Sequence, residues 1–299
     1  MKISNKLFIL VIGAQKAGTT SLHNLLLDHA RISLPRIKET HFFSNEEKFK
    51  KGEGWYFKQF DVRKDIMCEI DPSYLFYQCS PKRIKETIKN PKFIIIFRKP
   101  IDRALSHYLM SYYRGHEELS FIDALRSEPK RLKDIDNDFS LIHHSYIKRG
   151  NYSEQLNRYL IEFDKKDFLF IKFEDLISKE NRKKTIYSIV EFMEIKNEDI
   201  LFKMKHNNRR KKIKYEFIRD LLYKDNIIRT AVKKIISSDL LRIRLKEMIN
   251  FLNSSDYDSN NKFSNNILDS IPQKYFIWNN KQSKLLGEMT DLDTDNWIY

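Results

Sequence analysis

The stretch KLFILVIGAQKAGTTSLHNLL, residues 6–26, decides the fold of this chain of 299 residues. Its first part, from Lys6 to Ile12, is a nearly continuous apolar run, which predicts a strand buried on both faces. A turn follows, and from Thr19 onward hydroxyl residues lead into apolar residues at helical spacing. A buried strand, a loop and a helix in this order indicate a parallel α/β sheet.

Three further apolar runs predict the other strands, at Met67–Ile70, Phe93–Phe97 and Asp167–Phe173. Helical patterns fill the gaps, and two helices open on a proline, which suits the first turn. The predicted helices begin at Pro81 and Pro100 and cover Glu154–Phe163, Arg182–Phe192 and Lys274–Leu286. We therefore predict one domain over residues 1–299: a P-loop-like parallel sheet flanked by helices, with residues 203–299 as its mostly helical, basic extension.

The net charge of +14 indicates a polyanionic partner, such as nucleic acid, a phosphate-bearing cofactor, an anionic membrane or a sulfated glycan. Residues 203–246 carry 15 Lys or Arg against 4 acidic residues, so most of the surplus lies there. A solvated set of lysine-rich helices would give the same pattern. The charge alone therefore selects no function.

The sequence favours a soluble, cytoplasmic protein in a reducing compartment. No apolar run approaches the roughly 18 residues that a membrane span needs. The run Leu7–Ile12 is shorter than a usual signal-peptide core, and no small-residue cleavage site follows it. Two cysteines, Cys68 and Cys79, do not make a disulfide scaffold, and the absence of a CxxC pair argues against a metal site.

The turn between the first strand and helix predicts a phosphate-binding loop. Backbone N–H groups of such a loop converge on an anion, and the helix N-terminus adds the positive end of its dipole. The candidate ligands are Lys16, Ala17, Gly18, Thr19, Thr20 and Ser21.

This loop differs from the P-loop of nucleoside triphosphate enzymes, which reads GxxxxGK[ST]. Gly13 and Gly18 have that spacing, but the lysine stands inside the loop, at Lys16. A magnesium-dependent kinase also needs an acidic residue at the end of a neighbouring strand. The strand Phe93–Phe97 is followed instead by Arg98, which would repel a metal and attract a phosphate. We therefore expect a phosphate-like ligand and no metal.

Two motifs resemble those of sulfotransferases that use 3′-phosphoadenosine 5′-phosphosulfate (PAPS). GAQKAGTTSLHNLL is similar to their 5′-phosphosulfate loop, and FIIIFRKPIDRALSHY is similar to their second cofactor element. The resemblance implies that Arg98 and Ser106 hold the 3′-phosphate of the cofactor. Arginine suits this role because its planar guanidinium offers several donors to one phosphate.

The resemblance extends over nearly the whole chain and points to the bacterial and carbohydrate sulfotransferases. Residues 149–176 and 274–297 look like the later blocks of that group. It implies a P-loop-like fold, PAPS as co-substrate, no metal and a hydroxyl acceptor on a saccharide or glycolipid. The basic net charge would also suit an acceptor that is anionic.

KETHFF, residues 38–43, resembles the segment of heparan-sulfate-type sulfotransferases in which a glutamate acts as base. The resemblance places that role on Glu39, which would take the acceptor proton as the hydroxyl oxygen attacks sulfur. Lys16 would meet the charge that builds on the bridging oxygen of the leaving nucleotide. His41 would orient the acceptor, or act as the base itself if Glu39 is not in position.

Three other features leave alternatives open. Trp55, Tyr56 and Phe60 would suit contact with sugar rings or core packing equally well. Heparan-type enzymes commonly carry lysine where Ile70 stands, which disfavours a heparan-like substrate. The basic pair Arg209 and Arg210 would close over the cofactor, meet an anionic acceptor, or lie on a solvated surface.

The sequence thus predicts a PAPS-dependent sulfotransferase. One rival is a P-loop kinase that uses ATP and Mg²⁺, which the positions of Lys16 and Arg98 disfavour. The other is a basic nucleic-acid-binding protein, which would lack enzymatic activity. It is disfavoured because the chain has no helix-turn-helix, zinc or RNA-binding signature.

Overall fold

The computed structural model describes residues 6–133, 138–195, 211–213, 254–256, 267 and 270–299. Its main sheet has five parallel strands in the order β2-β3-β1-β4-β5. These strands are β1 (Leu7–Gly13), β2 (Ile32–Ser33), β3 (Ile66–Ile70), β4 (Lys92–Phe97) and β5 (Phe168–Lys172). The four strands predicted from apolar runs are confirmed, and β2 is an addition at the edge of the sheet.

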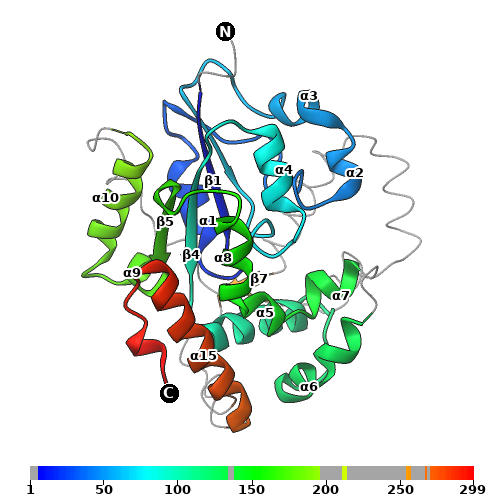
Figure 1. Cartoon of the computed structure of the whole chain (residues 1–299). Coiled ribbons are helices and arrows are strands. Elements are labelled where there is room, and N and C mark those ends of the chain that lie inside the picture. The colour runs from blue at the N-terminus through cyan, green and yellow to red at the C-terminus, as the bar shows by residue number, and fades with distance from the viewer. Residues whose placement is uncertain (1–5, 134–137, 196–210, 214–253, 257–266, 268–269) are drawn as a thin grey trace. The chain divides into compact units, whose positions relative to one another are not determined.

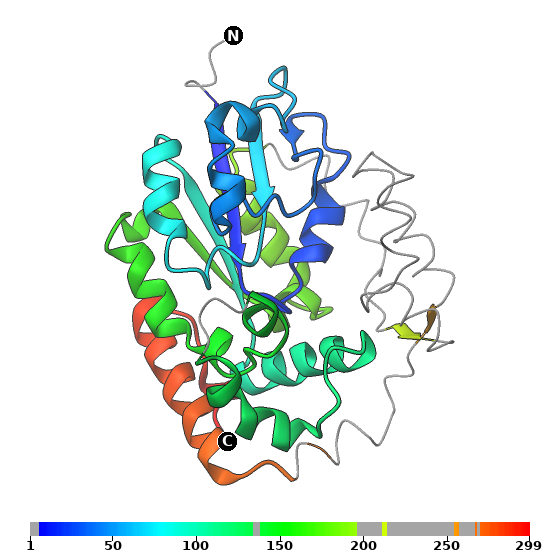
Figure 2. The ribbon, with the colours of Figure 1, turned by 90° about the vertical axis from the view of Figure 1, so that its right-hand side faces the viewer.

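Helices cover both faces of this sheet, as predicted. Figures 1 and 2 show α4 and α8 on one face and α1 and α10 on the other. The helices of the chain's first half are α1 (Thr19–Leu26), α2 (Glu46–Phe49), α3 (Gly52–Phe57), α4 (Ser80–Thr87), α5 (Pro100–Tyr113), α6 (Phe121–Arg131) and α7 (Asp138–His143). Those that follow are α8 (Tyr152–Leu160), α9 (Phe173–Ile177), α10 (Arg182–Phe192) and α15 (Gln273–Thr290), with short 3₁₀ turns at Lys148–Gly150, Lys165–Asp167 and Asp295–Trp297.

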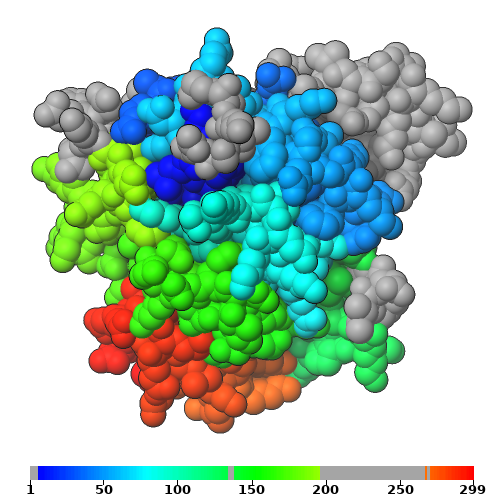
Figure 3. Space-filling view, turned by 45° about the horizontal axis from the view of Figure 1, so that its top comes forward, coloured from blue at the N-terminus to red at the C-terminus, as the bar shows by residue number. Residues whose placement is uncertain are grey.

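The core forms where the helices press apolar side chains onto the central strands. Residues 8–12 of β1 and 93–97 of β4 are buried along their whole length. Leu22 of α1, Leu156 of α8 and Ile189 of α10 pack into the same cluster. Burial of each such side chain stabilises the fold by roughly 1.5–3 kcal/mol. Outside this core, α4, α8 and α15 form a continuous surface (Figure 3).

The strand order creates a switch point at β1. The central residue Val11 pairs with Ile70 of β3 on one side and with Ile94 of β4 on the other. The chain therefore leaves β1 toward one side of the sheet and later returns to the opposite side. In open α/β sheets, ligands bind outside the carboxyl ends of the strands at such a point. The loop after β1 occupies this place.

The chain divides into two compact units. The first consists of Met1–Arg103, Lys148–Lys205 and Phe276–Tyr299 and contains the parallel sheet. The second consists of Ala104–Ile147 and His206–Tyr275. It holds α6, α7, most of α5 and a small antiparallel pair, β6 (Lys211–Ile213) with β7 (Ser254–Asp256).

Most of the helical, basic extension predicted over residues 203–299 lies outside the described residues, and its last helix is α15. The single domain stays a prediction. Within the parts of the chain that the structure describes, no helix has the length and apolar character of a membrane span.

Candidate functional site

The phosphate loop begins where β1 passes close to two neighbouring segments. A Cβ atom on Gly13 would lie 2.7 Å from the Leu75 side chain, so only glycine fits there. The N–H of the next residue, Ala14, donates a hydrogen bond of 2.7 Å to the carbonyl of Ile96 in β4. The loop is thereby held against the carboxyl end of β4.

The loop then turns through two residues in the left-handed region. Lys16 has a φ of 72°, and Gly18, which precedes α1, has a φ of 89°. Turns of this kind make concave sets of N–H groups that bind anions, and α1 adds its positive end. In the loop, Ala17 and Thr19 are buried, Lys16, Gly18 and Ser21 are half-buried, and Thr20 is exposed. The N–H groups of this loop and the N-terminus of α1 therefore suit a phosphate-like ligand.

Arg98 joins β4 to this loop. Its Nη1 donates a hydrogen bond of 3.1 Å to the carbonyl oxygen of Lys16. Its guanidinium carbon lies 4.7 Å from the centre of the Phe173 ring, which begins α9. The same ring covers the loop, because a Cβ on Gly18 would lie 2.9 Å from it. The structure thus brings together Lys16, Gly18 and Arg98, and adds Phe173, which sequence reasoning missed.

The structure does not place the other predicted cofactor ligands relative to this loop. Ser106 lies in α5, nearly buried, and belongs to the second compact unit, whereas Arg98 belongs to the first. Arg209 and Arg210 lie outside the described residues.

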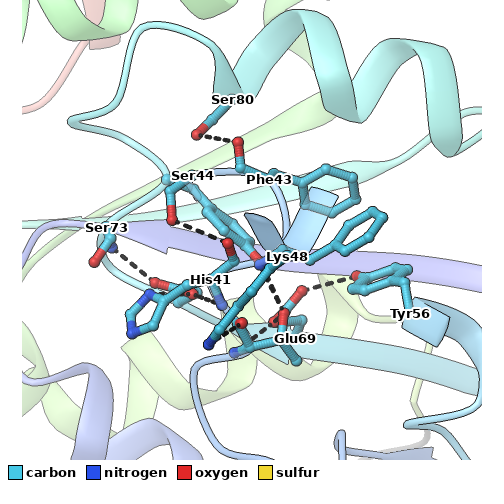
Figure 4. A network of polar contacts seen from close by, with 12 residues as sticks. His41, Phe43, Ser44, Lys48, Tyr56, Glu69, Ser73 and Ser80 are labelled. Atoms are coloured by element: carbon cyan, nitrogen blue, oxygen red, sulfur yellow. Dashed lines mark hydrogen bonds and ion pairs between the residues drawn. The ribbon is translucent and has the colours of Figure 1, made fainter. Parts of the chain in front are cut away.

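The segment with the candidate base is held by two buried carboxylates at the end of β3. Within it, Glu39 and His41 both have a φ of 54°, with Thr40 between them. Glu69 accepts hydrogen bonds from the Thr40 N–H, at 3.1 Å, and from the Thr40 hydroxyl, at 2.5 Å. It also accepts one of 2.8 Å from the Tyr56 hydroxyl (Figure 4).

Burial raises the pKa of Glu69 to about 7, with a further contribution from the negative charge of Asp71. The hydroxyl donors of Thr40 and Tyr56 oppose this shift because they stabilise the ionised form. The two hydrogen bonds of Glu69 hold Thr40, which lies between the candidates Glu39 and His41.

Asp71, the second carboxylate, binds His41 twice. Its Oδ2 accepts a hydrogen bond of 2.8 Å from the His41 N–H and lies 2.9 Å from the ring atom Nδ1. Burial alone would lower the pKa of His41, but the charge and hydrogen bond of Asp71 outweigh it, so the pKa is raised. Asp71 is fully buried, while the His41 side chain is 36% exposed. His41 therefore has one tethered side and one open side.

The phosphate loop and the segment with Glu39 and His41 lie at the same end of the sheet. The Asp71 N–H donates to the carbonyl of Val11 at 3.0 Å, and Leu75 N–H donates to Ile12 at 2.9 Å. The loop after β3 thus runs beside the last residues of β1, from which the phosphate loop starts. His41, tethered to Asp71, is brought to the same edge.

Lys48 binds the backbone of the segment between Glu39 and His41. Its Nζ donates a hydrogen bond of 2.8 Å to the carbonyl oxygen of Thr40 (Figure 4). Burial lowers the pKa of Lys48, and the charge of Asp71 partly offsets that shift.

For the aromatic residues, the structure favours core packing over sugar contact. Tyr56 and Phe60 are buried, and Tyr56 stacks on Phe42 with ring centres 4.8 Å apart. Ile70 is buried in the same core and carries no charged group. Within the described residues, no group of three or more His, Cys, Asp or Glu side chains could hold a metal ion.

Comparison with known proteins gives one family. A family model described as the sulfotransferase domain matches residues 8–226. The mouse heparan sulfate glucosamine 3-O-sulfotransferase 5 is 28% identical over 175 residues, which are 57% of this chain and 49% of that protein. The human heparan sulfate glucosamine 3-O-sulfotransferase 3B1 is 30% identical over 171 residues, which are 56% and 42% of the two chains.

A solved structure is similar over a larger share. The crystal structure of a sulfotransferase from Alicyclobacillus acidocaldarius has a TM-score of 0.57 and 25% identity, and the match covers 82% of this chain and 100% of that one. By contrast, the match spans about half or less of the length of the two curated relatives.

Proposed function

Because this chain belongs to the sulfotransferase domain family, which its match over residues 8–226 shows, we propose that it moves the sulfuryl group of PAPS to a hydroxyl of a saccharide or glycolipid. The observation that carries the proposal is the hydrogen bond from Arg98 to the Lys16 carbonyl. This bond holds the arginine at the end of β4 beside the phosphate loop. One ligand could then place its 3′-phosphate at Arg98 and its 5′-phosphosulfate in the loop.

In the proposed reaction, the acceptor oxygen forms a bond to sulfur while the bond from sulfur to the bridging oxygen of PAPS breaks. Glu39 takes the proton of the acceptor hydroxyl. The nucleotide leaves as the bisphosphate, and the ammonium of Lys16 stabilises the charge on its oxygen. The loop N–H groups hold the 5′ side of the nucleotide, and Arg98 with Ser106 holds the 3′-phosphate.

The acceptor class rests on the relatives, whose names give heparan sulfate as their substrate. The buried Ile70 argues for a different saccharide here, since this position presents no cation to a polyanionic chain. We propose an acceptor hydroxyl on a saccharide or glycolipid and a cytoplasmic location, where Cys68 and Cys79 would remain the free thiols that the structure shows.

A thermal-shift titration separates the three functional classes. Adenosine 3′,5′-bisphosphate, ATP with Mg²⁺ and duplex DNA are added in turn, and a ligand that binds the folded chain raises its melting temperature. The sulfotransferase proposal requires the bisphosphate to give the largest shift. A larger shift with ATP and Mg²⁺ would favour the kinase, and a larger shift with DNA the nucleic-acid-binding protein. A screen of acceptors with labelled PAPS then identifies the saccharide.

Arg98→Ala is expected to remove most of the preference for the bisphosphate over AMP. A charge-assisted hydrogen bond to phosphate contributes about 1.5–3 kcal/mol, or about 10- to 150-fold in affinity. Calorimetry with both nucleotides measures the preference. The control is Lys99→Ala, because Lys99 is the neighbouring cation and lies 3.5 Å from the Tyr299 ring centre. Equal affinity of the wild-type protein for the two nucleotides would contradict the 3′-phosphate site.

Sulfuryl transfer is expected to continue at full rate in EDTA. The reason is that Arg98, rather than a carboxylate, follows β4 beside the phosphate loop. The measurement compares initial rates with EDTA and with added Mg²⁺. A strict requirement for Mg²⁺ would favour the kinase hypothesis over the sulfotransferase proposal.

A further inference from the structure

Asp71 is a buried carboxylate, and one of its two oxygens bonds to the segment that carries His41. It is fully buried, and its Oδ2 faces both the backbone N–H and the ring Nδ1 of His41. Its Oδ1 accepts a hydrogen bond of 3.0 Å from the Ser73 N–H. A carboxylate loses much hydration when it is buried, so an arrangement of this kind needs strong compensating contacts. The imidazole of His41 is one of them, and the charges of Lys48 and Arg149 also interact with Asp71.

We infer that Asp71 is a positioning residue for sulfuryl transfer: it holds His41 as an imidazolium whose Nε2–H faces the open side of the site and donates a hydrogen bond to a substrate oxygen. This inference rests on the proposed function for its chemistry. Glu39 remains the group that takes the acceptor proton. His41 supplies positive charge and orientation, and no proton leaves it during transfer.

The charges around His41 favour the imidazolium. Asp71 raises the pKa of His41 against the effect of burial, and Glu39 adds a smaller contribution in the same direction. Among the described groups that act on the ring, Lys48 carries the opposing charge. The Lys48 ammonium is itself bound to the carbonyl of Thr40. The balance therefore keeps the proton on His41 at pH values where a free histidine would have lost it.

The first test measures His41 without any substrate. In the wild-type protein, ¹H–¹⁵N correlation spectra of the histidine side chains, assigned with His41→Gln, should show a His41 pKa above the ordinary value of 6.5. In Asp71→Asn that pKa should fall by about one unit or more, because a carboxylate partner is lost. Asparagine keeps one acceptor oxygen, which can serve the N–H of His41 or that of Ser73 but not both, because in the wild-type protein they bond to different oxygens of Asp71. The matched control is Asp65→Asn, in the exposed pair with Arg31.

The second test measures the pH dependence of transfer. Since the active form carries the imidazolium, the rate should fall as pH rises through the pKa of His41. Asp71→Asn should move this alkaline limb to lower pH by the shift seen in the spectra, with kcat affected more than the affinity for the bisphosphate. If Asp71 acts through His41, His41→Gln alone and His41→Gln with Asp71→Asn should have equal rates within about twofold.

Three results would overturn the inference. A wild-type His41 pKa at or below 6.5 would do so even if Asp71→Asn does not fold. An unchanged His41 pKa in a folded Asp71→Asn would make Asp71 a structural residue only. Movement of the acid limb in place of the alkaline limb would make His41 the base. The proposed function fails differently: the wild-type protein would then transfer no sulfuryl group, whatever its histidine spectra show.

Discussion

Glu39→Gln is expected to reduce the turnover number by about 10²–10⁴-fold, the usual loss when a general base is removed. Glutamine has the same shape and keeps one acceptor oxygen, but it cannot take a proton. The neighbouring Thr40 is fixed by Glu69 through two hydrogen bonds, so the substitution should leave the backbone in place. The affinity for the bisphosphate should hardly change, since the loop and Arg98 hold the nucleotide.

The experiment needs a working acceptor, followed by rate and affinity measurements on the variant. Glu53→Gln is the matched control, because Glu53 lies exposed on α3. Turnover of Glu39→Gln within about threefold of wild type would show that the base lies elsewhere, with His41 as the first candidate. Loss of the bisphosphate with the fold intact would move Glu39 to the nucleotide site.

Lys16→Ala is expected to lower the turnover number by about 10²–10³-fold, the range found when one preorganised donor to a developing negative charge is removed. It should also weaken PAPS binding, because the same ammonium interacts with the phosphosulfate group of bound PAPS before transfer begins. Lys16 has a left-handed backbone, and alanine carries the same Cβ penalty there as lysine. The loop therefore keeps its strain, and the effect reports on the side chain.

Steady-state rates and bisphosphate affinity separate the two contributions of Lys16. Lys58→Ala, at an exposed position after α3, is the control for loss of one positive charge. A raised KM with the turnover number within about threefold of wild type would limit Lys16 to ground-state binding.

The parts of the fold that follow from local pattern could be predicted from the sequence. Apolar runs indicated four strands, and α10 covers Arg182–Phe192, as the helical spacing predicts. β2 could not be found this way, because its two residues, Ile32 and Ser33, are a strand only through pairing with β3. Short helices such as α2 and α3 carry too few turns to show a period.

The candidate site also has a part that the sequence predicts from local motifs and a part that depends on the tertiary structure. The phosphate loop and Arg98 are contiguous motifs, so the sequence places them directly. The partners of Thr40 and His41 stand about thirty residues further on, and only the order of the strands brings them together. A signal was present: Glu69 and Asp71 flank a buried isoleucine where a parallel strand ends, which is where functional side chains gather. Without the strand order, nothing indicated which residues they would bind.

The ring of Phe173 has a consequence for how ligands bind. It covers Gly18 on the phosphate loop and lies against the guanidinium of Arg98, so a shift of either group moves the same side chain. An anion that displaces either group on binding would therefore move a side chain that the other subsite also contacts. Binding at the two subsites should be cooperative, with a coupling free energy shared by both. Inorganic phosphate in the loop would then sharpen selectivity at the arginine, and a smaller residue in place of Phe173 would uncouple the two subsites while leaving each able to bind alone.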